Sequence, residues 1–432
     1  MTMPTLISFA ADRYRNLHLS KGVALNPLNI LIGPNGSGKT NAVRLLQFLK
    51  SCVVGSADDL ASGTPLASSA RILGGSHMLD RSLKYPGRVD LTYEFLPPPD
   101  LRHRWASLTH ELGIYAYNSE SPVGLCFEAL SASQTKPDPQ LFYYYKFHDQ
   151  GIGKGVVSYF DTPDTRKSHF ERMEGLPTGV LGLAVLPDIL ERFSHAPDMT
   201  PVYPVRRYLI DHIRGWRFYN ANDMNFEEIR TSEPKIGPPD IYLSGSGNNL
   251  ALVMDNLVQR HLEFDERLNI AMKSVLPRTR KVRAVRTGLM GLAVQWHFDD
   301  TDAPFYLTEM SDGTVRMLCW ATVLLSPRLP TLLVIDEPEL GIHPAWLPML
   351  GEWIKDASRR TDVIVSTHSP DLLDHFTDSP ESVICFSTRD GRYFSAGPLS
   401  SERLEGKLKE GWQLGDLWRV GDPDLESCPV TE

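Results

Sequence analysis

Paired cysteines, a net positive charge and long apolar runs are all missing from this chain of 432 residues. Its five cysteines are scattered and none has C-x-x-C spacing, so neither a disulfide framework nor a zinc centre is predicted. No apolar run approaches the roughly 18–20 residues of a membrane span. Asp12, Arg13 and Arg15 stand where a signal peptide would need its apolar core. These absences indicate a cytoplasmic protein that makes no use of a membrane.

The net charge of −9 argues against a surface that coats nucleic acid nonspecifically, although it leaves room for a local basic groove. Hydrophobic residues make up 42% of the chain and charged residues 22%, as in an ordinary globular protein. A chain of this length can bury one large core or two modest ones.

The most informative motif is a glycine-rich loop that satisfies the pattern G-x-x-x-x-G-K-[ST]. It consists of Gly33, Pro34, Asn35, Gly36, Ser37, Gly38, Lys39 and Thr40. An apolar run at 28–32 predicts a buried strand before the loop, and residues 41–50, beginning with Asn41, predict a helix after it. Backbone N–H groups in such a turn point at one anion, and the helix N-terminus adds partial positive charge. The loop predicts triphosphate binding, with Lys39 on the β- and γ-phosphates and the Thr40 hydroxyl on Mg²⁺.

A second apolar run, at 331–335, is followed directly by Asp336 and Glu337. A continuous apolar run suits a central parallel strand, and ligands bind at the C-terminal edge of such sheets. We therefore expect Asp336 to hold Mg²⁺ and Glu337 to polarise the water that attacks the γ-phosphate. The alternative is a strand that merely ends in an acidic turn, which the phosphate loop in the same chain disfavours.

Two further segments complete the predicted site. His368 follows another short apolar strand at 362–366, a position that favours contact with the γ-phosphate over a purely structural role. Ser311, Asp312 and Gly313 open a predicted helix with Ser311 as its N-cap. Free N–H groups at that helix start would form a second anion site, and a plain helix cap is the alternative.

With these motifs in this order, the chain resembles the ABC-type ATPases, within them the branch of RecF, the SMC heads and the ATPase half of OLD-type nucleases. The resemblance covers about a third of the chain: the phosphate loop, the signature at 311–314, the Asp336–Glu337 strand, the D-loop position at 339–344 and His368. In transporter members the signature is usually LSGGQ. Here Asp312 replaces the first glycine and Thr314 the glutamine, as is typical of the non-transporter branch. The Q-loop glutamine is left unassigned.

The predicted fold class is α/β: a P-loop NTPase head of ABC type with a mostly parallel central sheet, an antiparallel β subdomain and a mixed, mainly helical insertion. We expect the head from residues 1–55 and 290–432, the β-rich part from 56–165 and the helical part from 166–289. Strand-like alternation at 89–95 and 142–147 supports the β subdomain. Helical spacing of apolar residues at 205–216 and 249–268 supports the insertion.

The resemblance also implies that two heads pack head-to-tail, with each ATP between the phosphate loop of one subunit and the signature of the other. The expected cofactors are ATP and Mg²⁺. The expected active unit is a homodimer or higher homo-oligomer that hydrolyses ATP to ADP and phosphate.

Two functional classes remain open. The first is a sensor or regulator whose ATP-driven closure controls a partner effector, a nuclease or toxin, in bacterial antiphage defence, where stand-alone ATPases resembling this one often occur. The second is a RecF-like DNA-binding ATPase of repair or recombination. Residues 273–286 carry six cations and no acid, which suits contact with DNA or RNA or, alternatively, a solvated strand. No nuclease centre is predicted, because Asp299, Asp300 and Asp302 suit a turn and the stretch after His368 is too short for the Toprim domain of OLD-type relatives.

Overall fold

The structure is a computed structural model that describes residues 4–54, 65–80, 84–118, 123–134, 141–149, 154–160, 170–185, 201–388 and 392–426. Most of its strands belong to one 14-stranded sheet in the order β10-β14-β15-β3-β16-β17-β2-β1-β4-β5-β6-β7-β8-β9. These strands are β1 (Leu6–Tyr14), β2 (Leu17–Ala24), β3 (Leu28–Ile32), β4 (Gly87–Phe95), β5 (Trp105–Ala116), β6 (Gly124–Gln134), β7 (Phe142–Asp149), β8 (Lys154–Phe160), β9 (Phe170–Pro177), β10 (Arg217–Asn220), β14 (Leu332–Asp336), β15 (Asp362–Ser366), β16 (Val383–Thr388) and β17 (Phe394–Pro398). A separate three-stranded sheet contains β11 (Thr279–Thr287), β12 (Gly291–Phe298) and β13 (Phe305–Tyr306).

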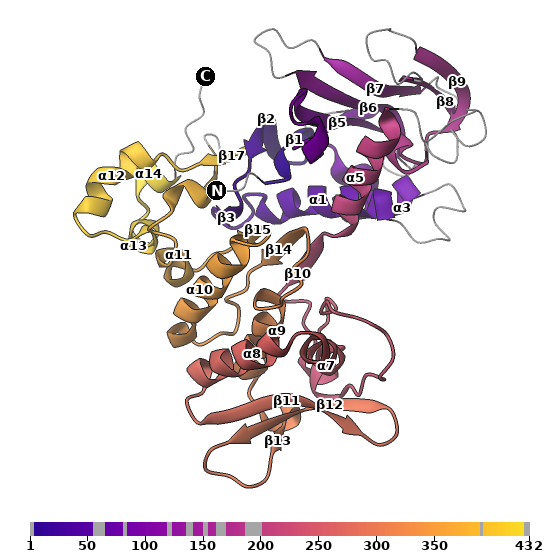
Figure 1. Cartoon of the computed structure of the whole chain (residues 1–432). Coiled ribbons are helices and arrows are strands. Elements are labelled where there is room, and N and C mark those ends of the chain that lie inside the picture. Colours follow the sequence, from indigo (N-terminus) through magenta and orange to yellow (C-terminus); the bar gives the residue numbers. More distant parts are fainter. Residues whose placement is uncertain are drawn as a thin grey trace.

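Helices connect and cover these sheets (Figure 1). They are α1 (Lys39–Val54), α3 (Pro65–Leu73), α5 (Val202–Arg214), α6 (Phe226–Thr231), α7 (Leu250–Arg260), α8 (Leu262–Val275), α9 (Asp312–Leu324), α10 (Leu347–Ser358), α11 (Pro370–Asp374), α12 (Ser401–Lys409), α13 (Leu414–Arg419) and α14 (Pro423–Glu426). No helix in the described ranges combines the length and the apolar character that crossing a bilayer requires.

The parallel part of the large sheet consists of β10, β14, β15, β3 and β16. Residues 30–32 of β3, 332–335 of β14, 363–365 of β15 and 383–386 of β16 are apolar and buried because both faces of these strands are covered. In β14, Leu332 and Val334 pack into the core that contains α1 and α5, whereas Leu333 and Ile335 pack into the core that contains α9 and α10. All five residues of β14 are buried. This arrangement leaves the strand ends as the place for polar chemistry.

Beyond β2 the sheet continues through β1 and β4 to β9 with antiparallel pairing at every step. The predicted fold class, a mostly parallel centre with an antiparallel β region, is therefore confirmed. The stretch at 166–289 was expected to lie outside the head. β10 comes from that stretch and nevertheless pairs with β14 at one edge of the parallel part. The three-domain division itself stays a prediction, and residues 55–64 and 161–169 near its borders lie outside the described residues.

The helical stretch expected at 249–268 is two helices rather than one. The extended backbone of His261, with φ −142°, ends α7 before α8 begins. Both helices pack on β11, and the fully buried Val282 and Trp296 contribute to the core between them and the small sheet. Figure 1 shows this unit at the opposite end of the molecule from β7, β8 and β9.

Asp362, the first residue of β15, makes folding stability depend on pH. Its carboxylate accepts a hydrogen bond from the Thr5 N–H at 2.9 Å, and burial raises the pKa of Asp362 from 3.8 to about 6. The folded state holds this proton more tightly than the unfolded state. The free energy of unfolding therefore falls as the pH rises from 3.8 through about 6. Asp362→Asn keeps an acceptor for Thr5 and removes the buried charge. We expect it to stabilise the protein by about 1–3 kcal/mol at pH 7.5 and to have little effect at pH 4. Urea unfolding at both pH values measures this, and equal effects at both would contradict it.

Candidate active site

The phosphate loop joins β3 to α1. Because α1 begins at Lys39, its first N–H groups have no partner within the helix and are available at the end of the loop. Gly36 and Gly38 have φ values of 78° and 98°, a left-handed backbone that residues with side chains rarely adopt. A Cβ atom on Gly38 would also lie 2.3 Å from Leu17 Cδ2. The loop conformation therefore requires glycine at these positions.

The buried side chain of Lys39 folds back into the loop. Its Nζ donates to the carbonyl oxygens of Gly33 at 2.7 Å and Pro34 at 3.2 Å. Burial lowers the pKa of Lys39 to about 8, a shift that the carboxylates of Glu337 and Asp336 oppose. At neutral pH the ammonium is thus mostly charged while its partners are neutral carbonyls. Phosphate oxygens are stronger acceptors for such a cation.

Asp336 ends β14 within a group of polar side chains that the strand register assembles. Asn220 on β10 and Ser366 on β15 are its register partners on either side. Asn220 Nδ2 donates to Asp336 Oδ2 at 3.0 Å, and Ser366 Oγ donates to Oδ1. Burial raises the pKa of Asp336, and the Ser366 hydrogen bond opposes this shift. The carboxylate is thereby fixed at the C-terminal edge of the sheet.

Glu337 and His368 face each other just beyond that edge. Glu337 has a φ of 52°, a conformation uncommon for a residue with a side chain. Its Oε2 accepts from Asn222 Nδ2 at 3.3 Å, and its Oε1 lies 3.6 Å from His368 Nε2. Burial lowers the pKa of His368, Lys39 lowers it further and Glu337 opposes both. His368 is therefore mainly neutral at physiological pH, so its ring can donate or accept a hydrogen bond.

These side chains line one cavity of about 220 Å³. Its lining consists of Gly36, Ser37, Gly38, Lys39, Thr40, Asn41, Asp336, Glu337 and His368. Segments more than 290 residues apart in the sequence thus meet at a single place, since Lys39 and Asp336 share this lining. Free helix N–H groups, a cation, a hydroxyl and a fixed carboxylate form a set of groups that would fit a triphosphate, and Thr40 and Asp336 would hold its Mg²⁺.

The predicted signature residues do not line this cavity. Ser311 caps α9, and its Oγ accepts from the Thr314 N–H at 3.3 Å. Asp312 pairs with Arg230. Ser311 and Asp312 are exposed, whereas every residue of α9 from Thr314 onward is buried. The body of the helix is held by the core while its N-terminus is presented to solvent, within reach of a second molecule.

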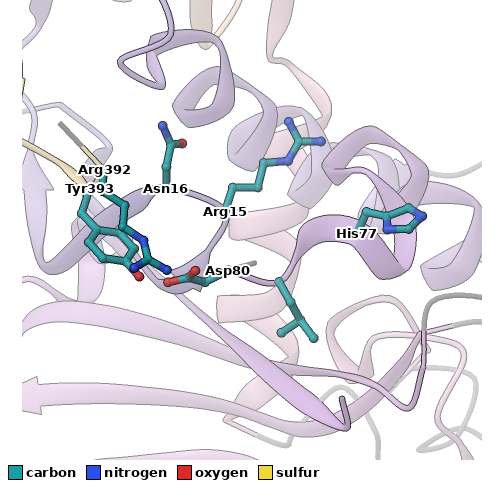
Figure 2. Close-up of a pocket in the computed structure, with 7 residues that line it drawn as sticks. Arg15, Asn16, His77, Asp80, Arg392 and Tyr393 are labelled. Atoms are coloured by element: carbon teal, nitrogen blue, oxygen red, sulfur yellow. The ribbon is translucent and has the colours of Figure 1, made fainter. Parts of the chain in front are cut away.

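A second cavity, of about 500 Å³, adjoins the phosphate loop and was not predicted. It is lined by Arg15, Asn16, His77, Leu79, Asp80, Arg392 and Tyr393 (Figure 2). Two hydrogen bonds connect it to the predicted site: Arg15 Nη1 donates to Asn41 Oδ1 at 2.8 Å, and Asn16 Nδ2 donates to the Gly36 carbonyl at 3.2 Å.

The sequence carries no motif for this second cavity, since its walls come from three distant segments. Arg15 and Asn16 form the turn between β1 and β2, where Arg15 has a φ of 52°. Tyr393 precedes β17, and its ring stacks on His18 with centroids 4.1 Å apart. An Arg–Asn pair in a tight turn was the one local signal, and it does not distinguish a binding wall from an ordinary hairpin turn.

Three comparisons with known proteins were made for this chain. A search of curated proteins found no match. Among solved structures, the Smc head bound to the C-winged helix domain of ScpA is similar over 93% of this chain and 99% of its own, with 16% identity and a TM-score of 0.51. The Smc head with an extended coiled coil bound to the C-terminal domain of ScpA, from Pyrococcus furiosus, is 12% identical with a TM-score of 0.46, over 94% and 99% of the two chains. The first likeness shows the fold, that of a P-loop ATPase head.

A family model described as "AAA domain, putative AbiEii toxin, Type IV TA system" matches residues 28–81 and 156–374. These residues are more than half of the chain and include the phosphate loop, the signature, the Asp336–Glu337 strand and His368. The predicted resemblance to ABC- and SMC-like ATPases is confirmed by this match together with the fold. The chain belongs to this family of AAA-domain proteins and has the fold of an SMC head.

Proposed function

We propose that the chain binds ATP with Mg²⁺ in the 220 Å³ cavity and hydrolyses it. The observation that supports this most is the meeting of Lys39, Asp336, Glu337 and His368 on one lining. Lys39 and the loop N–H groups bind the β- and γ-phosphates, and Thr40 and Asp336 hold the metal ion. Bound Mg²⁺ supplies neutralisation of the charge on the phosphates.

In the same proposal Glu337 orients the attacking water, for which its Oε1 faces the cavity beside His368. His368 contacts the γ-phosphate through its imidazole ring. The test is phosphate release by the purified chain with ATP and Mg²⁺, repeated with EDTA. Release that EDTA does not reduce would contradict the assigned metal role.

We further infer that the nucleoside part of ATP occupies the neighbouring 500 Å³ cavity. The hydrogen bonds from Arg15 to Asn41 and from Asn16 to Gly36 make the two cavities adjacent. Tyr393 supplies to the lining an aromatic ring that stacks on His18 (Figure 2). A base can stack on such a ring without hydrogen-bond readout.

The catalytic unit in this proposal is a head-to-tail dimer. The exposed N-terminus of α9 at Ser311 and Asp312 supports it, because these residues stand outside the cavity of their own chain. Docked on the partner's γ-phosphate, that helix N-terminus adds positive potential and excludes water. ATP then holds the dimer together and hydrolysis releases it.

The biological role we propose is regulation of a partner effector, a nuclease or toxin, in bacterial antiphage defence within the cytoplasm. The family description, which names an AbiEii toxin and a type IV toxin–antitoxin system, supports this role. The test compares the proteins that co-purify with a tagged chain locked in the ATP-bound state and those that co-purify with a tagged chain that cannot bind ATP. A partner specific to one nucleotide state supports the proposal, and identical sets of co-purifying proteins contradict it.

A second candidate function, DNA binding by a RecF-like ATPase, is favoured by one surface. On β11 the side chains of Arg280, Arg283 and Arg286 are exposed and form no hydrogen bond or ion pair with any described residue. Burial lowers the pKa of the neighbouring His297, and Arg283 and Arg280 lower it further. Unpaired cations crowded on one strand suit a phosphate backbone. By contrast, Lys281 pairs with Asp265 at 3.0 Å and Arg278 pairs with Asp300.

If this surface binds DNA, replacing Arg280, Arg283 and Arg286 together by Gln will weaken binding at least about 10-fold at low salt. The slope of log affinity against log salt will fall by about 2–3, since each lost phosphate contact removes roughly 0.9. Fluorescence anisotropy with a labelled duplex measures both quantities. Arg207→Gln with Arg214→Gln on α5, two exposed arginines near Asp211, is the matched control. Equal affinities of wild type and triple variant would exclude this surface.

A further inference from the structure

Glu339 connects two loops beside the candidate active site without lining its cavity. It follows Glu337 and Pro338 at the end of β14, and its side chain is partly buried. Its Oε1 accepts from Thr367 Oγ1 at 2.6 Å and from the His368 N–H at 3.0 Å. Its Oε2 is enclosed and has no hydrogen-bond partner among the described residues. One carboxylate oxygen therefore fixes the peptide that carries the His368 imidazole.

The loop that contains Glu339 also packs on α9 in the same chain, both at Gly313 near its start and at Trp320 further along. Trp320 Nε1 on α9 donates to the Pro338 carbonyl at 3.0 Å. A Cβ atom on Gly313 would lie 3.1 Å from the Gly341 carbonyl oxygen, so the two backbone segments approach each other closely. The loop is therefore in direct contact with the predicted signature at one end and with the His368 peptide at the other.

Arg316 closes this contact from the side of α9. Its side chain is 7% exposed, its Nη1 donates to the Ala221 carbonyl at 3.0 Å, and its guanidinium lies over the Phe226 ring at 4.7 Å. The same guanidinium would lie 3.7 Å from a Cβ atom on Gly341. A buried, hydrogen-bonded arginine of this kind is a rigid support. The start of α9 and the loop at 338–341 are thus packed against each other around Arg316.

We propose that Glu339 is a positioning residue for His368. The position of the His368 imidazole at the γ-phosphate then depends on how the signature helix α9 packs against the loop at 338–341. This proposal rests on the proposed ATP hydrolysis at the same site. In the head-to-tail dimer the signature contacts the partner's ATP, so Glu339 connects nucleotide contact at one site to hydrolysis at the other. Glu339 touches no substrate and acts only through His368.

The first test uses Glu339→Ala, Glu339→Gln, His368→Ala and the double variant Glu339→Ala/His368→Ala. Glu339→Ala releases both hydrogen bonds, and we expect kcat to fall about 10- to 100-fold because a displacement of about 1 Å can cost that much. KM and the Kd for ATP should stay within about twofold. Glu339→Gln retains an acceptor oxygen for Thr367 and His368 and should keep at least about half of kcat.

The double variant decides between positioning and a merely structural role. If Glu339 acts through His368, the double variant is no slower than His368→Ala alone. Multiplied losses, or a kcat of Glu339→Ala equal to wild type, would overturn the proposal. Thermal unfolding of each variant checks that the chain is folded.

A second measurement needs no turnover, so it separates this proposal from the proposed function. NMR of the histidine rings identifies the His368 signal as the one missing in His368→Ala. Glu339→Ala should shift that signal and its titration, and Glu339→Gln should leave both near their wild-type positions. A wild-type chain that releases no phosphate contradicts the proposed hydrolysis. A His368 signal unmoved by Glu339→Ala contradicts the positioning role whether or not the chain hydrolyses ATP.

Discussion

Glu337→Gln, given ATP and Mg²⁺, is expected to convert the chain into a stable dimer of twice the mass. The amide keeps the size of the side chain, while its weaker basicity removes the group that polarises the attacking water. Loss of a general base costs about 100- to 10,000-fold in turnover, so the ATP-bound state persists. The backbone of Glu337, with its φ of 52°, and its neighbours Asn222 and His368 place this side chain against the cavity that would hold the γ-phosphate.

Light scattering coupled to gel filtration measures this mass with ATP, with ADP and without nucleotide. Adding Lys39→Ala to Glu337→Gln is the matched control, because a chain that cannot bind ATP should stay at its starting mass. Ser311→Glu tests the other half of the interface, since a carboxylate at the exposed cap of α9 would repel the partner's phosphates. An unchanged mass of Glu337→Gln with ATP would rule out the ATP-held dimer.

Lys39→Ala is expected to abolish ATP binding, with a loss of at least about 100-fold in affinity. Among the described residues that line the cavity, Lys39 is the one cation, and hydrogen bonds between a cation and phosphate are about twice as strong as neutral ones. Since the pKa of Lys39 is about 8 in the free protein, wild-type affinity should also fall as the pH rises above that value. Isothermal titration calorimetry measures both effects.

Two comparison variants define what the loss means. Lys50→Ala removes another lysine of α1. Burial also lowers the pKa of Lys50 to about 8, but its Nζ donates to the Trp216 carbonyl at 2.6 Å and lies outside the cavity. This variant should bind ATP like the wild type. His368→Ala should bind ATP within about threefold of wild type while hydrolysing it at least about 10-fold more slowly. Equal losses of binding in Lys39→Ala and His368→Ala would refute the roles assigned to both residues.

Local motifs account for most of what could be predicted about the site. The phosphate loop, the acidic pair and His368 each follow a short apolar strand, so their elements could be assigned without knowledge of the rest of the chain. A parallel sheet brings such strand ends to one edge, and the structure places all three on one lining. The same reasoning missed Asn220, which is part of no recognisable local pattern, and it placed Glu339 in the D-loop position without giving its side chain a role.

Periodicity also misled where a single residue decides the backbone. The apolar spacing at 249–268 is continuous across His261, yet the chain turns there and forms α7 and α8. β10 was overlooked for a related reason: four residues, Arg217–Asn220, are too short for alternation to be detected. Their strand conformation depends on pairing with β14, which lies more than 100 residues away.

By itself the sequence determined the strand–loop–helix of the phosphate site, the α/β class and the chemical groups available for ATP and Mg²⁺, because these depend on neighbouring residues and their spacing. The tertiary structure alone decided which polar groups surround those residues. Asn220 and Ser366 hold Asp336 because β10, β14 and β15 pair in one register. The cavity at Arg15 and Tyr393 exists because three distant segments of the chain meet beside the loop. Such contacts follow from the packing of segments far apart in the chain, and no local pattern of side chains encodes them.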